Sequence, residues 1–372
     1  MRTTVTVGDV AGIVETWAPR AIAWDRDNIG LQVGSLSTVV RGILVCLDVT
    51  PSTVAEASRR RANLIVSHHP LLFNPLRRLE SGNSVSDAIR LAIRHGIDIY
   101  SAHTNLDFAQ DGVSFALAEA LGLNDVSFLS RTLRTKRKIV TYLPAEYADP
   151  VAAAMAEHGA GLIGDYAHCS FRIPGTGTFM GSETTSPAIG MKKRFQRVDE
   201  VRLEMLADEW QVDAIVAAMK SVHPYEEVAY DIVRLDNLSP EYGMGTIGTL
   251  PRPLRLDTFV RRIKQSLGSS AVRHTKGTGT PVSRVALCGG SGSELLQEAL
   301  RQQADAFVTA DVRYHTFQEA EGRIALIDAG HFETEFPAVK QLASKLRLLF
   351  RNRSSGIRVT VSRVSTNPVM FA

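Results

Sequence analysis

Short runs of β-branched and apolar residues, each ending in polar side chains, constrain the fold of this 372-residue chain more than any other feature. Six such runs are followed by helical periodicity, at 42–48, 63–69, 97–103, 284–288, 305–311 and 323–328. Nearly continuous apolar strands that alternate with helices are typical of a sheet covered by helices on both faces. The pattern therefore predicts an α/β core built on one sheet, with polar residues at the carboxyl ends of its strands, where such folds bind ligands.

The segment between these two groups of strands has a different pattern. Its predicted elements are a strand, a helix, two strands, a helix and a strand, at 137–144, 149–158, 168–179, 198–207, 210–220 and 228–235. The order β-α-β-β-α-β is that of the ferredoxin-like unit. We therefore predict a discontinuous α/β core domain, residues 1–134 and 239–372, with an inserted ferredoxin-like α+β domain at 135–238.

Composition narrows the classes of function. With 44% apolar and 22% charged residues the chain resembles an ordinary globular protein, and its formal net charge is only +3. Its basic clusters are short, which does not favour nucleic-acid binding. The three cysteines are far apart and odd in number, which favours reduced thiols over disulfides. Without an apolar leader or a stretch of membrane-spanning length, we expect a cytoplasmic protein with no membrane segment.

Histidines and carboxylates gather at or just past the predicted strand ends. The histidines are His68, His69, His103, His315 and His331, and the carboxylates are Asp48, Asp107, Asp311, Asp328 and Glu335. Taken singly, each group has a plainer explanation. A His-His pair can be part of a turn, and a histidine four residues before a carboxylate can be a contact on the surface of a helix. A metal site explains the combination better, because strand ends of one sheet converge on one edge.

Imidazoles and carboxylates without cysteine suit borderline divalent ions such as zinc, iron or manganese. We predict five ligands, His68, His69, Asp107, His331 and Glu335. A bridging carboxylate among them is enough for two metal ions per chain with open positions for water. The nearby His103, His315, Asp48 and Asp311 would then orient the ligands or carry protons.

A glycine-rich block, 288–294, follows a predicted strand and opens a helix. The backbone amides of Gly289, Gly290 and Ser291 could hold a phosphate at the helix N-terminus. The block matches neither nucleotide-binding fingerprint, and a tight strand-to-helix turn explains it equally well. Both interpretations stay open at this point.

Several blocks resemble the signature blocks of the GTP cyclohydrolase I type II homologue family: 27–34, 67–73, 102–107, 309–315 and 328–335, with 222–231 resembling the inserted domain of its longer members. The resemblance implies a dinuclear site on the same five ligands, and a ring-shaped homohexamer whose metal sites face an internal cavity. Two departures are visible. The chain has Trp-Asp-Arg-Asp-Asn at 24–28, where the family usually runs Trp-Asp-Asn, and Thr246 where many members carry Arg.

Two classes of function fit these observations. The leading hypothesis is a metal-dependent hydrolase of a nucleotide or another phosphorylated small molecule, because open metal positions supply activated water. The family label suggests GTP ring-opening, but many other hydrolytic reactions need the same groups. The alternative is a non-catalytic protein that stores, delivers or senses metal, with the inserted domain as a partner or effector module. Acid/base residues such as His103 and His315 favour the enzyme.

Overall fold

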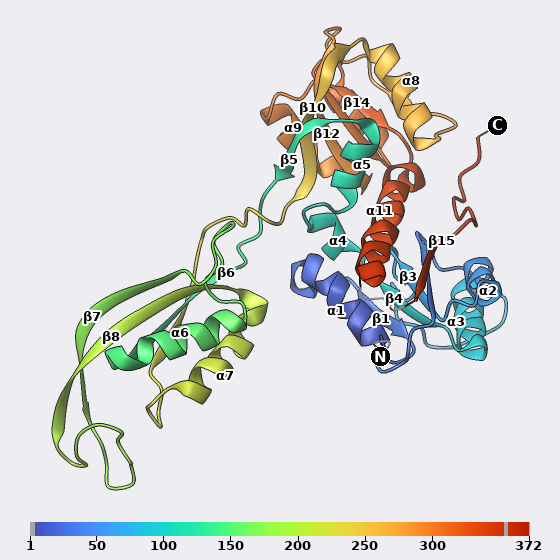
Figure 1. The fold of residues 1–372 in the computed structure, drawn as a ribbon. Helices are drawn as coiled ribbons and strands as arrows, with labels where there is room; N and C mark the ends of the chain where they lie inside the picture. The colour runs from blue at the N-terminus through green and yellow to red at the C-terminus, as the bar shows by residue number, and fades with distance from the viewer. Residues whose placement is uncertain (1–3, 353–355, 372) are drawn as a thin grey trace. The chain divides into compact units, whose positions relative to one another are not determined.

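The computed structural model describes residues 4–352 and 356–371. The chain forms two compact units, which we call the core unit (Met1–Thr132 with Pro240–Ala372) and the inserted unit (Leu133–Ser239). Figure 1 follows the chain through both of them. Among the described residues, every helix is too short or too polar to cross a membrane.

The first sheet of the core unit has five strands in the order β1-β4-β3-β2-β15. Its centre consists of three parallel strands, β2 (Gly42–Cys46), β3 (Leu64–Ser67) and β4 (Asp98–Ser101), joined by α2 (Pro51–Arg59) and α3 (Ser84–His95). All residues of these three strands are buried, which explains their apolar runs. The edges are antiparallel β1 (Gly30–Val33) and, from the far end of the chain, parallel β15 (Arg358–Val361).

The second sheet has six strands in the order β11-β14-β13-β12-β10-β5. Three parallel strands again form its centre: β12 (Val282–Ser291), β13 (Ala306–Ala310) and β14 (Ala325–Asp328), with α9 (Leu296–Arg301) and α10 (Tyr314–Ala320) between them. Antiparallel strands extend it: β11 (Arg273–His274) on one side, β10 (Met244–Leu254) and β5 (Asn124–Ser130) on the other. Helix α8 (Leu256–Leu267) covers it with the fully buried Phe259 and Ile263.

The prediction of one sheet in the core was therefore wrong, although the α/β class is confirmed. Apolar periodicity identifies buried strands but does not say which strands pair, and here the two sets of parallel strands belong to separate sheets. The long helix α11 (His331–Asn352) contacts β12 and β13 of the second sheet and β2 and β15 of the first. The remaining helices of the core unit are α1 (Val7–Trp17), η1 (Arg20–Ile22), α4 (Thr104–Phe108), α5 (Val113–Leu121) and η4 (Ser293–Leu295).

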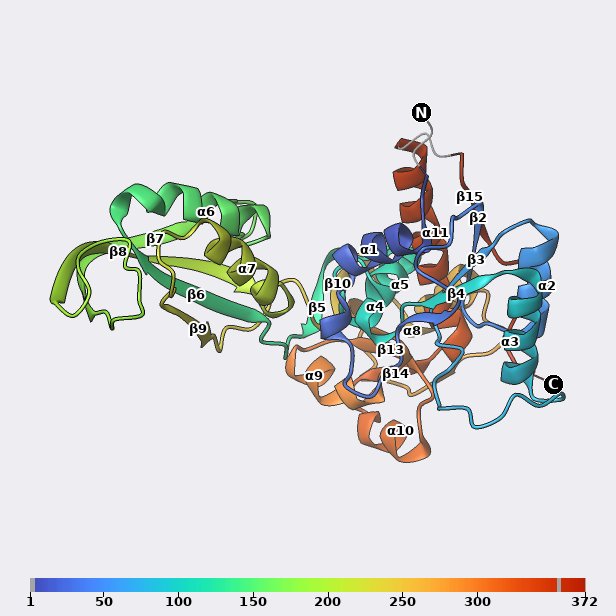
Figure 2. The ribbon, with the colours of Figure 1, turned by 90° about the horizontal axis from the view of Figure 1, so that it is seen from below.

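The inserted unit has the predicted ferredoxin-like plan. Its strands lie in the order β7-β8-β6-β9, all antiparallel, with α6 and α7 on one face of the sheet (Figure 2). The elements are β6 (Lys136–Leu143), η2 (Ala145–Tyr147), α6 (Ala148–Glu157), β7 (Ser170–Met180), β8 (Phe195–Asp208), η3 (Glu209–Gln211), α7 (Val212–Val222) and β9 (Tyr230–Arg234). Val151, Met155, Ile215 and Met219 of the helices pack on the sheet in a hydrophobic cluster drawn from this unit alone.

We propose that residues 1–134 and 239–372 fold without the inserted domain. Ser130 of β5 pairs directly with Met244 of β10, so the chain leaves and re-enters the second sheet at adjacent positions. A short Gly/Ser linker in place of residues 135–238 would close these strands as a hairpin. We expect a cooperatively unfolding core with the same metal content per chain as the intact protein, measured by thermal unfolding and elemental analysis. A folded core that binds no metal would show that the insertion contributes to the site.

Candidate metal centre

The five residues predicted as ligands come together within the core unit, although they come from two sheets. His68 and His69 directly follow β3, and Asp107 lies on α4, which follows β4. His331 and Glu335 lie at the start of α11, after β14. The Nε2 atoms of His69 and His331 each lie 3.0 Å from one oxygen of Glu335. The Nε2 atom of His68 lies 3.8 Å from Glu335 Oε1 and 3.7 Å from Asp107 Oδ1.

Glu335 is the central residue of this cluster. It lies one helical turn after His331, so both side chains project from the same face of α11. Glu335 is buried, with only 4% of its surface exposed. Gly290, with φ +61°, lets the carboxylate approach the end of β12, because a Cβ there would lie 2.2 Å from Glu335 Oε1. The glycine is thus required by the close approach of a carboxylate.

The same glycine-rich block has few amides free for a phosphate. The Gly289 amide donates to Ser114 Oγ at 3.3 Å, and the Gly290 amide donates to Thr334 Oγ1 at 3.0 Å. Ser291 is the last residue of β12, which pairs it with β13. A phosphate bound here would have to replace these internal acceptors.

Each of the three imidazoles predicted as ligands is held by its Nδ1 atom, so that Nε2 faces the cluster. The Nδ1 contacts are His68 with Ala102 O at 2.9 Å, His69 with Asp48 Oδ1 at 2.7 Å, and His331 with Asp311 Oδ2 at 2.6 Å. A carbonyl or carboxylate accepting from Nδ1–H fixes the tautomer that leaves an Nε2 lone pair for a metal. Asp48 and Asp311 therefore have the orienting positions that the sequence predicted. Asp311 has a φ of +54°, a left-handed conformation that is uncommon outside glycine.

His103 adds a fourth imidazole to the cluster. Its ring centroid lies 5.3 Å from that of His68 and 5.5 Å from that of His69. Its Nδ1 atom lies 3.0 Å from Asp27 Oδ1, and Asp27 also accepts from the amide and hydroxyl of Thr104 at 3.0 and 2.5 Å. Burial alone would raise the pKa of Asp27, but these hydrogen bonds lower it to about 2. Asp27 was not predicted for this role, because it follows no apolar strand, although it opens one of the family-like blocks.

The structure does not bring His315 to the cluster. It is exposed on α10, where its Nδ1 atom lies 3.1 Å from Gln318 Oε1, one turn later in the same helix. The sequence placed it near the site because it falls just past the predicted strand 305–311. However, α10 begins only at Tyr314, and the residues that line the cluster's cavity do not include it.

The charges of the cluster fit a bound divalent cation. Burial would raise the pKa of Glu335, but hydrogen bonding to the imidazoles holds it well below its usual value. Although burial disfavours charged imidazole, the neighbouring carboxylates raise the pKa of His69 to about 10 and that of His331 to about 9. Nε2 of His68 is buried without a hydrogen-bond partner among the described residues. A metal ion would replace the protons that this arrangement otherwise attracts.

Two overlapping groups of side chains could each hold an ion. One consists of His68, His69 and His103, the other of His69, His331 and Glu335, and the ligand atoms of each group lie within 4.8 Å of one another. Asp107 belongs to neither group, although its carboxylate faces His68. Burial raises the pKa of Asp107 despite the nearby imidazoles. The two groups share His69, and His103 lies closer to the predicted ligands than the sequence suggested.

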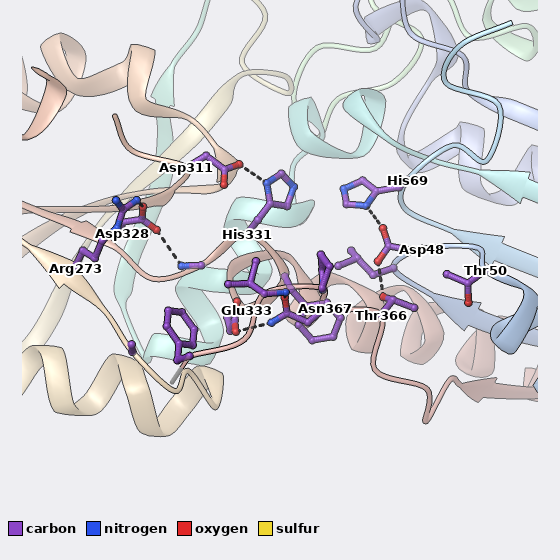
Figure 3. A pocket seen from close by; sticks show the side chains of 17 residues that line it. Asp48, Thr50, His69, Arg273, Asp311, Asp328, His331, Glu333, Thr366 and Asn367 are labelled. Carbon is purple, nitrogen blue, oxygen red and sulfur yellow. Dashed lines mark hydrogen bonds and ion pairs between the residues drawn. The ribbon is translucent and has the colours of Figure 1, made fainter. Parts of the chain in front are cut away.

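A cavity of ≈ 650 Å³ adjoins His69 and His331 (Figure 3). Its wall includes the orienting carboxylates Asp48 and Asp311 and the C-terminal residues 366–369 and 371. Thr366 donates to Asp48, and Arg273 pairs with Asp328. The volume is in the range of small-molecule sites.

Comparison with known proteins gives consistent results over the whole chain. A family model described as Duf34/NIF3 (NGG1p interacting factor 3) matches residues 5–368. The chain is 35% identical to the GTP cyclohydrolase 1 type 2 homolog of Bacillus subtilis, over 100% of both chains. It is 38% identical to that of Mycobacterium tuberculosis, over 98% of this chain and 96% of the relative. The crystal structure of a Bacillus cereus protein related to NIF3 matches with a TM-score of 0.84 and 35% identity, covering 100% of both chains.

Proposed function

Because this chain belongs to the Duf34/NIF3 family, whose relatives share its whole length, we propose that it is a dinuclear metal-dependent hydrolase. Its substrate would be a nucleotide or another phosphorylated small molecule. The observation that carries the proposal is that His69 and His331 converge on the two oxygens of Glu335. The Nδ1 atoms of both imidazoles contact carboxylates, those of Asp48 and Asp311. Imidazoles oriented in this way are typical of metal ligands.

The residues have distinct roles in this proposal. His68, His69, Asp107, His331 and Glu335 would hold two divalent ions, zinc, iron or manganese, with Glu335 at the centre because its two oxygens face different histidines. When bound, such a pair of ions lowers the pKa of a water molecule and stabilises both oxygens of a displacement. His103 would accept or donate the proton, since Asp27 fixes the orientation of its ring.

The proposal includes an assembly and a location. The family resemblance described above implies a homohexamer, and we propose that state for this chain. We also propose that the protein works in the cytoplasm, where thiols such as Cys46 and Cys288 stay reduced.

A turnover assay with and without metal tests the hydrolase. The chain is stripped with a chelator, reconstituted with zinc, manganese or iron, and incubated with a panel of nucleotides and phosphoesters that includes GTP. We expect hydrolysis only in the reconstituted samples, and its loss on renewed chelation. If a chain carrying two ions turns over nothing in the panel, the hydrolase is rejected in favour of metal storage, delivery or sensing.

A further inference from the structure

Two exposed aromatic side chains flank the metal cluster. Trp24 is 53% exposed and lines the small cavity that also contains His69, His103 and Glu335. Phe73 is 55% exposed, and its ring meets that of His103 edge-on with centroids 6.2 Å apart. Single exposed apolar residues are common, but two aromatic rings beside one polar site form a surface suited to a flat ligand.

Trp24 is held firmly at this position. Its backbone amide donates to Thr104 Oγ1 at 3.0 Å, and Thr104 in turn donates to the Asp27 carboxylate that holds His103. Its ring packs edge-on against Phe108, with centroids 6.2 Å apart. The backbone of Trp24 and the His103 ring are therefore positioned by one shared set of hydrogen bonds.

Phe73 is fixed through the residue before it. The Leu72 carbonyl accepts from Asn28 Nδ2 at 2.7 Å, and the Leu72 amide donates to Gln32 Oε1 at 3.1 Å. Asn28 and Gln32 belong to the family-like block 27–34, yet neither is a metal ligand. Their contacts tie the segment that carries Trp24 to the segment that carries Phe73.

Phe73 also lines a basic groove. The groove has a volume of ≈ 940 Å³ and is lined by Arg26, Arg77 and Arg78 together with apolar side chains such as Leu76. All three arginines are exposed. Arg78 lies 3.5 Å from Glu80, whereas Arg26 and Arg77 have no carboxylate partner in the described part of the chain. Unpaired guanidinium groups are well suited to phosphate, which they can bind through two hydrogen bonds.

We propose that Trp24 and Phe73 stack the ring of a phosphorylated heterocyclic ligand and that Arg26 and Arg77 bind its phosphate. The ring then lies beside the metal cluster and the phosphate lies in the basic groove. This inference rests on the proposed function, since it specifies the substrate class of the same site. It also gives the phosphate a place other than the glycine-rich block, whose amides have internal acceptors. Arg26 falls at the departure from the usual Trp-Asp-Asn block, so this contact would be particular to chains that carry it.

Calorimetric titration of the metal-loaded full-length protein tests the proposal. The probes are guanosine and adenosine 5′-monophosphates, the two nucleosides, and ribose 5-phosphate. We expect the monophosphates to bind more tightly than the nucleosides, which lack the phosphate, and more tightly than ribose 5-phosphate, which lacks the heterocyclic ring. Trp24→Ala and Phe73→Ala should each weaken binding of monophosphates and nucleosides about tenfold, by loss of stacking. The double variant Arg26→Ala, Arg77→Ala should weaken binding of the monophosphates and of ribose 5-phosphate but not that of the nucleosides.

Matched controls are available for both kinds of contact. Phe195 is 62% exposed in the inserted unit, and Arg59 is exposed at the end of α2, so Phe195→Ala and Arg59→Ala should leave all affinities unchanged. Trp24→Phe retains a ring and should keep most of the affinity, and unchanged metal content shows that a variant is intact. Monophosphates that do not bind, or that bind equally to the Trp24→Ala and Phe73→Ala variants, overturn the inference. If the inference fails but another phosphorylated compound is turned over, the proposed hydrolase still stands. If the monophosphates bind as expected but nothing is turned over, the hydrolase is rejected and the binding site for the ring and phosphate is retained.

Discussion

The Glu335→Gln variant should retain little of the metal that the wild-type protein binds, with the content falling from about two ions per chain to below about one. Both oxygens of Glu335 face imidazole nitrogens at 3.0 Å, and an amide of the same shape supplies neither the negative charge nor a second strong oxygen ligand. Elemental analysis after reconstitution and dialysis measures the loss. His68, His69 and His331 would also lose a carboxylate that raises the pKa of their imidazoles. The metal-free variant should therefore bind fewer protons than the metal-free wild-type protein.

Glu333 is the matched control for this change. It lies two residues earlier on the same helix, where its carboxylate accepts from Asn367 Nδ2 at 2.9 Å, and it lines the ≈ 650 Å³ cavity. Glu333→Gln should therefore keep the wild-type metal content. If Glu335→Gln still binds two ions per chain, the metal ions are bound at a site other than this cluster.

Replacing His103 with alanine should lower turnover by about 10²- to 10⁴-fold, the range expected for loss of a proton-transferring side chain. Asp27→Asn should have a smaller effect of about 10- to 100-fold, because the imidazole remains but loses the carboxylate that orients it. Both variants should keep their metal, since the five ligands are unchanged. Rates are measured on reconstituted protein whose metal content has been determined for each variant.

His315→Ala is the control for the His103 variant. The side chain is exposed on α10 and bonded to its own helix, so turnover should not change. Loss of one ion from His103→Ala would contradict the assigned role and make His103 a ligand with His68 and His69.

Much of the fold could be predicted from buried parallel strands, because burial on both faces leaves a continuous apolar run in the sequence. Strands outside the three central parallel ones of each sheet leave weaker patterns in the sequence. β10 contains Gly248 and Pro251, residues that argue against a central strand, yet it joins two neighbours in the second sheet. β15 pairs with β2, more than 300 residues earlier in the chain, and no local pattern indicates such a pairing. These strands decide that the core has two sheets.

The candidate site was predictable to the extent that its residues follow strands. His68, His69 and Asp311 come directly after buried strands, and the predicted grouping with His331 and Glu335 matches their observed proximity. Asp27 follows no such strand, and only the folded chain places it against His103. Conversely, His315 follows a strand end closely, but helix α10 carries it away from the cluster.

The pairing of β15 with β2 has a consequence for the order of events during synthesis. A growing chain that ends before residue 331 contains His68, His69 and Asp107 but lacks His331 and Glu335, so it cannot complete the cluster. The edge of the first sheet beside β2 also stays open until residues 358–361 have been made. An open strand edge is prone to pairing with other chains, so the chain is most exposed to misassociation before β15 has been made. The cluster itself can be completed only once residue 335 has been made.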